Sequence, residues 1–110
     1  NYLTFMATIK STDDTYKKLI EENKIIFFDF FGTWCSPCTA LSPILDSIAL
    51  EMKDKIVIAK HDIDSDPDFP TLSSVRGVPA LYMYKDKKLV SQKVGMSNKA
   101  DLVSWINQYI

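Results

Sequence analysis

The stretch from Ile25 to Phe31 (IIFFDFF) constrains the fold more than any other part of the chain. Every residue in it is apolar except Asp29, so a β-strand formed here would be apolar on both faces. Strands buried on both faces lie in the middle of sheets that helices cover on both sides. The stretch therefore predicts the central strand of an α/β domain.

The segments around this strand alternate between strand patterns and helix patterns. We expect strands at residues 7–9, 25–31, 55–63, 80–84 and 89–94. We expect helices that begin at Ser11–Asp14, at Ser36, over residues 69–74, and at Ser97 or Asn98. The resulting order, β-α-β-α-β-α-β-β-α, predicts a parallel core with an antiparallel hairpin at one edge.

Composition excludes several classes of partner. A chain of 110 residues with 46% hydrophobic residues is long enough for one domain with its own core. The formal net charge of −1 gives no basic field for nucleic acid, and no apolar run approaches the ~20 residues of a membrane span. We expect residues 1–110 to form one domain, with residues 1–5 as an N-terminal extension that is disordered or introduced by cloning.

The only two cysteines, Cys35 and Cys38, follow the predicted central strand at the start of the longest predicted helix. Three residues apart on the first turn, their thiols lie on one face and can form a disulfide. A structural disulfide closing so short a loop would contribute only about 2 kcal/mol. A zinc site needs about four ligands, and the chain adds only His61 to the two thiols. The pair therefore favours redox chemistry.

The position of the pair suits a reactive thiol. The N-terminus of a helix carries partial positive charge and free N–H groups, which favour a thiolate at Cys35 and make it the expected nucleophile. Pro37 fits the first helical turn, where its missing N–H has no cost. A short loop also makes the disulfide easy to open, as a catalytic disulfide requires.

Asp29 is the one charged residue inside the apolar strand. Burial should raise the pKa of its carboxyl, and Lys60 on the neighbouring strand is its expected charge partner, which would partly offset that shift. Buried carboxyls with a raised pKa cluster at functional sites, so we expect Asp29 to exchange a proton with Cys38. The alternative is an aspartate that is merely tolerated through its pairing with Lys60.

The acidic stretch after His61 has a simpler interpretation. Aspartates at positions 62, 64, 66 and 68 alternate as at the start of a calcium loop, but Pro67 and Ser73 stand where such a loop needs Gly and Glu. We expect a solvated acidic turn without a metal. We expect His61 to pack or to face solvent rather than to catalyse.

The motif WCSPC, placed after an apolar strand with Asp29 six residues before Cys35, resembles the active site of the thioredoxin family. The resemblance continues, in order and over nearly the whole chain, at Pro43, Ala59–Lys60, Val78–Pro79 and Lys93–Gly95. It implies the thioredoxin fold, an α/β domain with a central mixed five-stranded sheet flanked by four helices.

The resemblance also implies an activity and a site. The protein would reduce protein disulfides: Cys35 would attack, Cys38 would resolve the mixed disulfide, and Pro79 would be a cis proline beside them. A flat surface would bind an extended substrate segment through Trp34, Ser36, Pro37, Gly77, Val78, Gly95 and Met96. No cofactor beyond the Cys35–Cys38 disulfide is expected.

The expected partners follow from the same resemblance. Diverse disulfide-containing proteins would be the substrates, and a separate flavoprotein, a thioredoxin reductase, would return the dithiol to its reduced form. We expect a monomer in the cytoplasm, without nucleic acid or membrane as partners.

The chain departs from the usual family motif at four positions. Ser36 stands in place of Gly, Thr39 in place of a basic residue, Phe31 in place of Trp, and Ala80 in place of Thr. We expect these differences to alter the reduction potential and the choice of partners, but not the dithiol chemistry.

Two other functions stay open from the sequence. An exported oxidoreductase or isomerase would carry the same motif, and a processed terminus at Asn1 would favour it. A thioredoxin-like binding module would use the surface around Trp34 and Pro79 for docking alone. The reduction potential separates the two enzymes, and disulfide reduction that survives the loss of both cysteines would indicate the binding module.

Overall fold

The computed structural model describes residues 7–110, so the extension expected at residues 1–5 lies outside the described residues. Its elements are β1 (Ile9–Ser11), α1 (Tyr16–Glu22), β2 (Ile25–Phe31), α2 (Ser36–Glu51), β3 (Val57–Asp62), α3 (Asp68–Leu72), β4 (Ala80–Lys85), β5 (Lys88–Val94) and α4 (Lys99–Asn107). The expected order of strands and helices is confirmed. β1 begins two residues later than expected, and α1 begins only at Tyr16.

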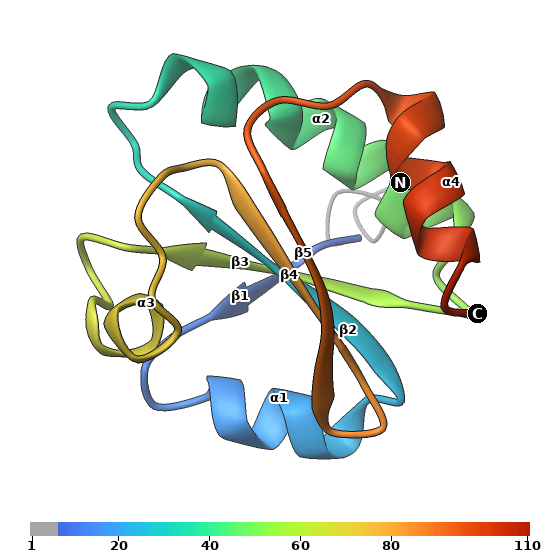
Figure 1. The fold of residues 1–110 in the computed structure, drawn as a ribbon, viewed down its shortest axis with the longest axis horizontal. Helices are drawn as coiled ribbons and strands as arrows, with labels where there is room; N and C mark the ends of the chain where they lie inside the picture. The colour runs from blue at the N-terminus through green and yellow to red at the C-terminus, as the bar shows by residue number, and fades with distance from the viewer. Residues whose placement is uncertain (1–6) are drawn as a thin grey trace.

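The strands form one sheet in the order β1-β3-β2-β4-β5, with β2 in the middle. β1, β3 and β2 are parallel, while β4 is antiparallel to both β2 and β5. α2 and α4 cover one face of the sheet, and α1 and α3 cover the other (Figure 1). The parallel core with an antiparallel hairpin at one edge is as predicted.

Side chains of β2 enter both halves of the core. Phe27 packs with Leu41 and Leu45 of α2 and with residues of α4 on one face. Phe28 and Phe30 pack with aromatic residues of α1 and α3 on the other face, where Phe28 meets Phe69 edge to face. The central strand therefore links two hydrophobic clusters, as its doubly apolar sequence requires.

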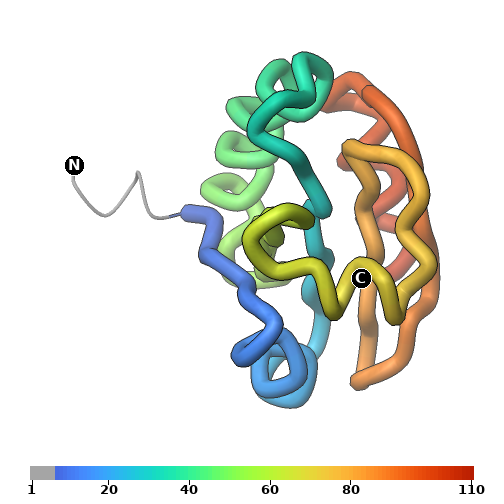
Figure 2. Tube along the Cα trace, turned by 90° about the vertical axis from the view of Figure 1, so that its left-hand side faces the viewer, coloured from blue at the N-terminus to red at the C-terminus, as the bar shows by residue number. Residues whose placement is uncertain are grey.

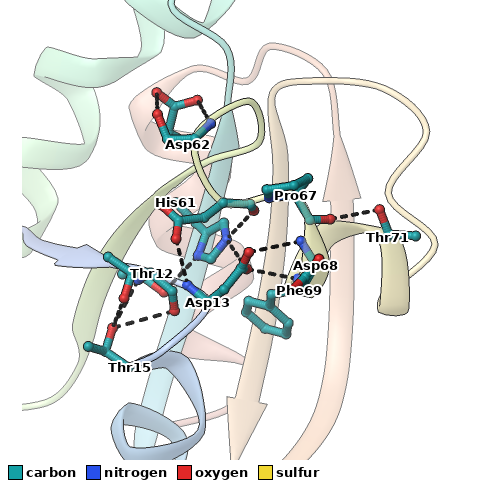
Figure 3. Close-up of polar contacts among 12 residues, drawn as sticks. Thr12, Asp13, Thr15, His61, Asp62, Pro67, Asp68, Phe69 and Thr71 are labelled. Atoms are coloured by element: carbon teal, nitrogen blue, oxygen red, sulfur yellow. Dashed lines mark hydrogen bonds and ion pairs between the residues drawn. The ribbon is translucent and has the colours of Figure 1, made fainter.

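A polar cluster joins the ends of β1 and β3 to the start of α3 (Figure 3). The carboxylate of Asp13 accepts hydrogen bonds from the backbone N–H groups of Asp68 and Phe69, each at 2.9 Å. It also lies 3.3 Å from Nε2 of His61, a fully buried side chain whose Nδ1 is 2.8 Å from the Ser11 hydroxyl oxygen. His61 therefore packs inside the domain, one of the two outcomes expected.

This cluster gives the segment Ser11–Asp14 a second role. The segment is expected to cap the helix that follows it, and Thr12 bonds at the start of that helix: its backbone N–H donates to the Thr15 hydroxyl oxygen at 2.9 Å, and its carbonyl oxygen accepts from the Tyr16 N–H at 3.1 Å. Asp13 in addition caps α3, which is distant in sequence. The reason is topological, because β1 and β3 are parallel neighbours and the segments that leave them meet at one edge of the sheet.

Leu45 is completely buried against β2, whereas Leu50 in the same helix is exposed. Leu45→Ala should lower the free energy of unfolding by about 2–5 kcal/mol through lost apolar burial and the cavity that remains. Leu50→Ala is the matched control and should change it by less than about 0.5 kcal/mol. Urea unfolding measures both, and equal losses would contradict the assigned core.

Asp13 should make stability depend on pH. Burial alone would raise its pKa, but hydrogen bonds from Phe69 and Asp68 and the neighbouring His61 lower it below the ordinary value of 3.8. The folded state then binds the proton more weakly than the unfolded state, so the stabilisation is present above the ordinary pKa and is lost as pH falls below it.

Asp13→Asn should therefore lower the free energy of unfolding by about 1–2 kcal/mol near neutral pH. The difference from the parent should shrink as pH falls through the acid range. The exposed neighbour provides the control, Asp14→Asn, which should show neither effect. Urea melts at several pH values test this, and a difference that is constant with pH would refute the ionic role.

Candidate active site

The two cysteines lie where the central strand ends and α2 begins. Figure 2 shows the chain passing from β2 through a short loop into the first turn of α2. Cys35 is the N-cap of this helix, its sulfur accepts a hydrogen bond from the Cys38 backbone N–H at 3.2 Å, and Pro37 lies in the first turn. Cys35 and Cys38 are joined by a disulfide. The expected position of the pair at a helix N-terminus is confirmed.

The start of α2 stabilises negative charge on the Cys35 sulfur. The helix is 16 residues long and presents its positive end to the N-cap residue. The N–H of Cys38 points at the same sulfur atom. When the disulfide is reduced, both effects favour a thiolate at Cys35, the ionic form that attacks disulfides.

A second loop, between α3 and β4, lies against the disulfide. The Val78–Pro79 peptide bond is cis, as expected, and the Val78 carbonyl oxygen is 3.8 Å from the Cys35 sulfur. The Gly95 N–H donates to the Pro79 carbonyl oxygen at 2.8 Å. Gly95 has a φ of +91°, a backbone region that favours glycine. The loop with the cis proline therefore borders the dithiol, and the loop of Gly95 is hydrogen-bonded to it.

The residues expected to bind substrate lie on these loops and differ in exposure. Trp34 is 67% exposed and Met96 is 49% exposed. Ser36, Pro37 and Gly77 are also exposed, while Val78 and Gly95 are half-buried. Beside them lies Val94, which was not expected in the site; it is 68% exposed, and a Cβ atom on Gly77 would lie 3.7 Å from its side chain. No sequence signal marks Val94, because its pattern predicts only the last residue of a strand.

Trp34 is held in place by two residues, Gly32 and Asp64, that were not expected in the site. A Cβ atom on Gly32 would lie only 2.6 Å from the Trp34 ring, so only glycine lets the indole lie across this position. The indole N–H donates to a carboxylate oxygen of Asp64 at 2.7 Å. Gly32 could have been suspected from its place between strand and dithiol, whereas Asp64 is far in sequence and gave no such signal.

Asp29 and Cys38 line the same pocket, which has a volume of about 360 Å³. Asp29 is only 2% exposed, and its Oδ1 atom has no hydrogen-bond partner among residues 7–110. Thr39, Ser42 and Lys60 also line this pocket. The buried carboxyl and the second cysteine of the pair thus line one partly open pocket.

Burial raises the pKa of Asp29 from 3.8 to about 7, and the charge of Lys60 opposes this rise. The direction is the one expected from the sequence. Lys60 is the charge partner expected from the sequence, because its charge lowers the pKa of Asp29. Its ammonium makes its hydrogen bonds elsewhere, to the Ser42 hydroxyl and to Asp46 Oδ1, the latter at 3.0 Å. Lys60 therefore acts on Asp29 through charge rather than through an ion pair.

The acidic stretch after His61 forms a hydrogen-bonded turn. The Asp62 carboxylate accepts from the Asp64 backbone N–H at 2.9 Å and from the Ser65 hydroxyl at 3.3 Å. Within residues 7–110, no group of three or more His, Cys, Asp or Glu side chains could hold a metal ion. In the same part of the chain, no helix has the length and apolar character needed to cross a membrane.

Comparison with known proteins places this site in a family. The family model described as Thioredoxin matches residues 7–108. A thioredoxin from Buchnera aphidicola is 38% identical over 103 residues, which cover 93% of this chain and 94% of that protein. A thioredoxin from Acidithiobacillus ferridurans is 34% identical over 105 residues, or 94% and 97% of the two chains.

A solved structure agrees with these relatives. A mutant thioredoxin from Halobacterium salinarum superposes with a TM-score of 0.86 at 26% identity, covering 93% of this chain and 89% of that one. Two sulfurs that alternate between disulfide and dithiol carry two electrons without any other redox group. With its cysteines at the helix start and its whole fold matched, this chain belongs to the thioredoxin family and is a thiol-disulfide oxidoreductase that reduces disulfides.

Proposed function

We propose that Cys35 attacks substrate disulfides, that Cys38 resolves the mixed disulfide, and that Asp29 accepts the proton that Cys38 gives up. The observation that carries this assignment is the different surroundings of the two sulfurs. Cys35 is the helix N-cap, beside the Val78 carbonyl and the exposed loops. Cys38 lines the pocket of Asp29. The Cys35 sulfur therefore lies at the proposed substrate surface, and Cys38 lines the pocket of the proposed base.

The reaction balances with the sulfur atoms and one carboxyl. The Cys35 thiolate attacks one substrate sulfur, the substrate disulfide breaks, and the other substrate sulfur leaves as a thiolate that takes a proton. Cys38 then passes its proton to Asp29 and attacks the Cys35 sulfur. The bond between Cys35 and the attacked substrate sulfur breaks, and that sulfur leaves as a thiolate and is protonated. Cys35 and Cys38 are then joined by a disulfide, and two electrons have moved from the dithiol to the substrate. No further cofactor is needed.

The exposed loops around Cys35 form the proposed binding surface for substrate. Trp34 gives it an aromatic face fixed by Asp64, and the cis Val78–Pro79 segment offers backbone groups next to the reacting sulfur. An extended peptide can bind such backbone groups with little dependence on its own side chains. Ser36, Pro37, Gly77, Gly95 and Met96 complete the surface, which suits a broad range of disulfide-containing proteins.

The family implies disulfide substrates and a reductase as partners in general. We assign the return to the dithiol to a separate thioredoxin reductase, and we place the protein in the cytoplasm as a monomer. The cytoplasm keeps thiols reduced, which matches a protein that donates electrons to disulfides. Measurement of the reduction potential tests this direction, because an oxidising value would instead favour an exported enzyme that forms disulfides.

The order of attack can be read from trapped intermediates. Cys38→Ser should still attack a disulfide substrate and then stop as a mixed disulfide on Cys35, because the resolving thiol is gone. Cys35→Ser should form no such adduct and should show no reductase activity. Mass spectrometry of the non-reduced protein measures the adducts, and a partner attached to Cys38 in the Cys35→Ser variant would reverse the assignment.

The raised pKa of Asp29 predicts a pH-dependent change in stability. Its carboxyl binds a proton more strongly in the folded state, so stability falls as pH rises from about 4 to about 7 and is constant above that range. Asp29→Asn removes this loss and should be more stable than the parent at about pH 8, by at most about 4 kcal/mol. Near pH 4 the two should be similar.

The same variant tests the proton transfer. Asp29→Asn should resolve the mixed disulfide more slowly near neutral pH, because it has no group to take the Cys38 proton. The exposed Asp54 provides the matched control, Asp54→Asn, for which neither stability nor rate should change. Urea melts of the oxidised proteins and single-turnover kinetics measure the two effects. An Asn variant that resolves at the parent rate would eliminate Asp29 as the proton acceptor.

A further inference from the structure

Two residues of α2 hold the side chain of Lys60. Cys38, Ser42 and Asp46 follow one another at intervals of four residues, so they lie along one side of the helix. The Lys60 ammonium donates to the Ser42 hydroxyl and to Asp46 Oδ1. Asp46 Oδ1 also accepts from the Thr8 hydroxyl at 3.2 Å, which fixes the carboxylate. The ammonium is therefore held against the side of α2 that also carries Cys38.

Lys60 and Asp29 line the same pocket. Lys60 of β3 and Asp29 of β2 are register partners in neighbouring parallel strands, so their side chains leave the sheet on the same face. Both line the pocket that contains Cys38, and Ser42 lines it as well. Asp46 does not line this pocket, and its side chain is 52% exposed. Ser42 therefore holds the ammonium at the pocket, while Asp46 draws it toward solvent.

We propose that Ser42 and Asp46 are positioning residues that fix the Lys60 ammonium at the wall of the Asp29 pocket and so set the pH at which Asp29 titrates beside Cys38. The arrangement is a balance of two opposite charges near one buried carboxyl. Its consequence for catalysis depends on the proposed role of Asp29 as proton acceptor, but the positioning of Lys60 can be measured independently.

The charges that face Asp29 come from few elements. Lys60 on β3 lowers the pKa of Asp29, and Asp46 on α2 raises it. On β4, the register partner of Asp29 is Leu81, which carries no charge. On β1, Lys10 is the register partner of Lys60, and it lines a neighbouring cavity together with Asp62 rather than the Asp29 pocket. Lys60 and Asp46 are thus the two residues whose charges shift the pKa of Asp29.

Removal of the Ser42 hydroxyl and removal of the Asp46 charge should shift the pKa of Asp29 in opposite directions. Loss of the Ser42 hydroxyl leaves Lys60 to Asp46 alone, so the ammonium should move away from Asp29 and the pKa of Asp29 should rise. Loss of the Asp46 charge removes a repulsion from Asp29 and leaves Lys60 less neutralised, so the pKa of Asp29 should fall. Each shift should be about half a pH unit, or a factor of about three in proton affinity.

The experiment is an NMR titration of the Asp29 carboxyl carbon in the oxidised protein, with Asp29→Asn to identify the signal. Ser42→Ala should raise the midpoint, Asp46→Asn should lower it, and Ser42→Thr, which keeps the hydroxyl, should restore the parent value. The same helix supplies matched controls, because Ser47 and Glu51 contact Lys99 by the same kinds of interaction. Ser47→Ala and Glu51→Gln should leave the midpoint unchanged.

Unchanged midpoints in both variants, or shifts of the same sign, would overturn the proposal. A general loss of structure would be detected by urea melts, and it would also shift the midpoint in the control variants. The pH profile of the resolving step, measured in the same variants, tests the proposed function. Opposite midpoint shifts without a matching change in that profile would support the positioning of Lys60 and refute Asp29 as the proton acceptor.

Discussion

Burial of β2 on both faces is the constraint on which the rest of the structure depends. Phe27 anchors the α2 side of the core and Phe28 anchors the α3 side, so the strand has almost no freedom to shift in register or to move to an edge. Its carboxyl end is consequently a fixed point. The dithiol is attached to that point through only three residues, Gly32–Trp34, and the start of α2 is fixed with it.

The same burial creates the chemistry of Asp29. A carboxyl inside a fully covered strand loses its hydration, and burial is the largest cause of its raised pKa. A pKa of about 7 lets this group hold or release a proton near neutral pH, where thiols exchange with disulfides. Lys60 and Asp46 adjust that value from opposite directions. The core therefore stabilises the fold and also raises the pKa of one of its carboxyls to about 7.

The surface around Cys35 differs from the buried strand β2, because three loops form it. The N-terminus of α2 provides the thiolate-stabilising charge, the cis Val78–Pro79 segment borders Cys35, and Gly95 is bonded to that segment. Each loop follows or precedes a strand of the sheet, so the sheet order sets their distances. Trp34 shows the same dependence, because its indole is fixed by Asp64 from the turn after β3.

Periodicity and local motif were sufficient to predict the order of elements, the central place of β2, and the cysteine pair at a helix start. These are properties of neighbouring residues, for which burial pattern and helix-end chemistry give a direct signal. The raised pKa of Asp29 was also predictable, because a charge within an apolar run must lose solvent. The cis bond before Pro79 was expected only from the family resemblance.

Contacts between distant segments were decided by the tertiary structure. Asp13 caps α3, which is distant in sequence, and the Lys60 ammonium donates to Ser42 and Asp46 rather than to Asp29. In each case several partners were compatible with the local sequence. The choice among them depends on which strand ends and helix faces the sheet brings within about 3 Å, the range of a hydrogen bond, and no local pattern encodes that distance.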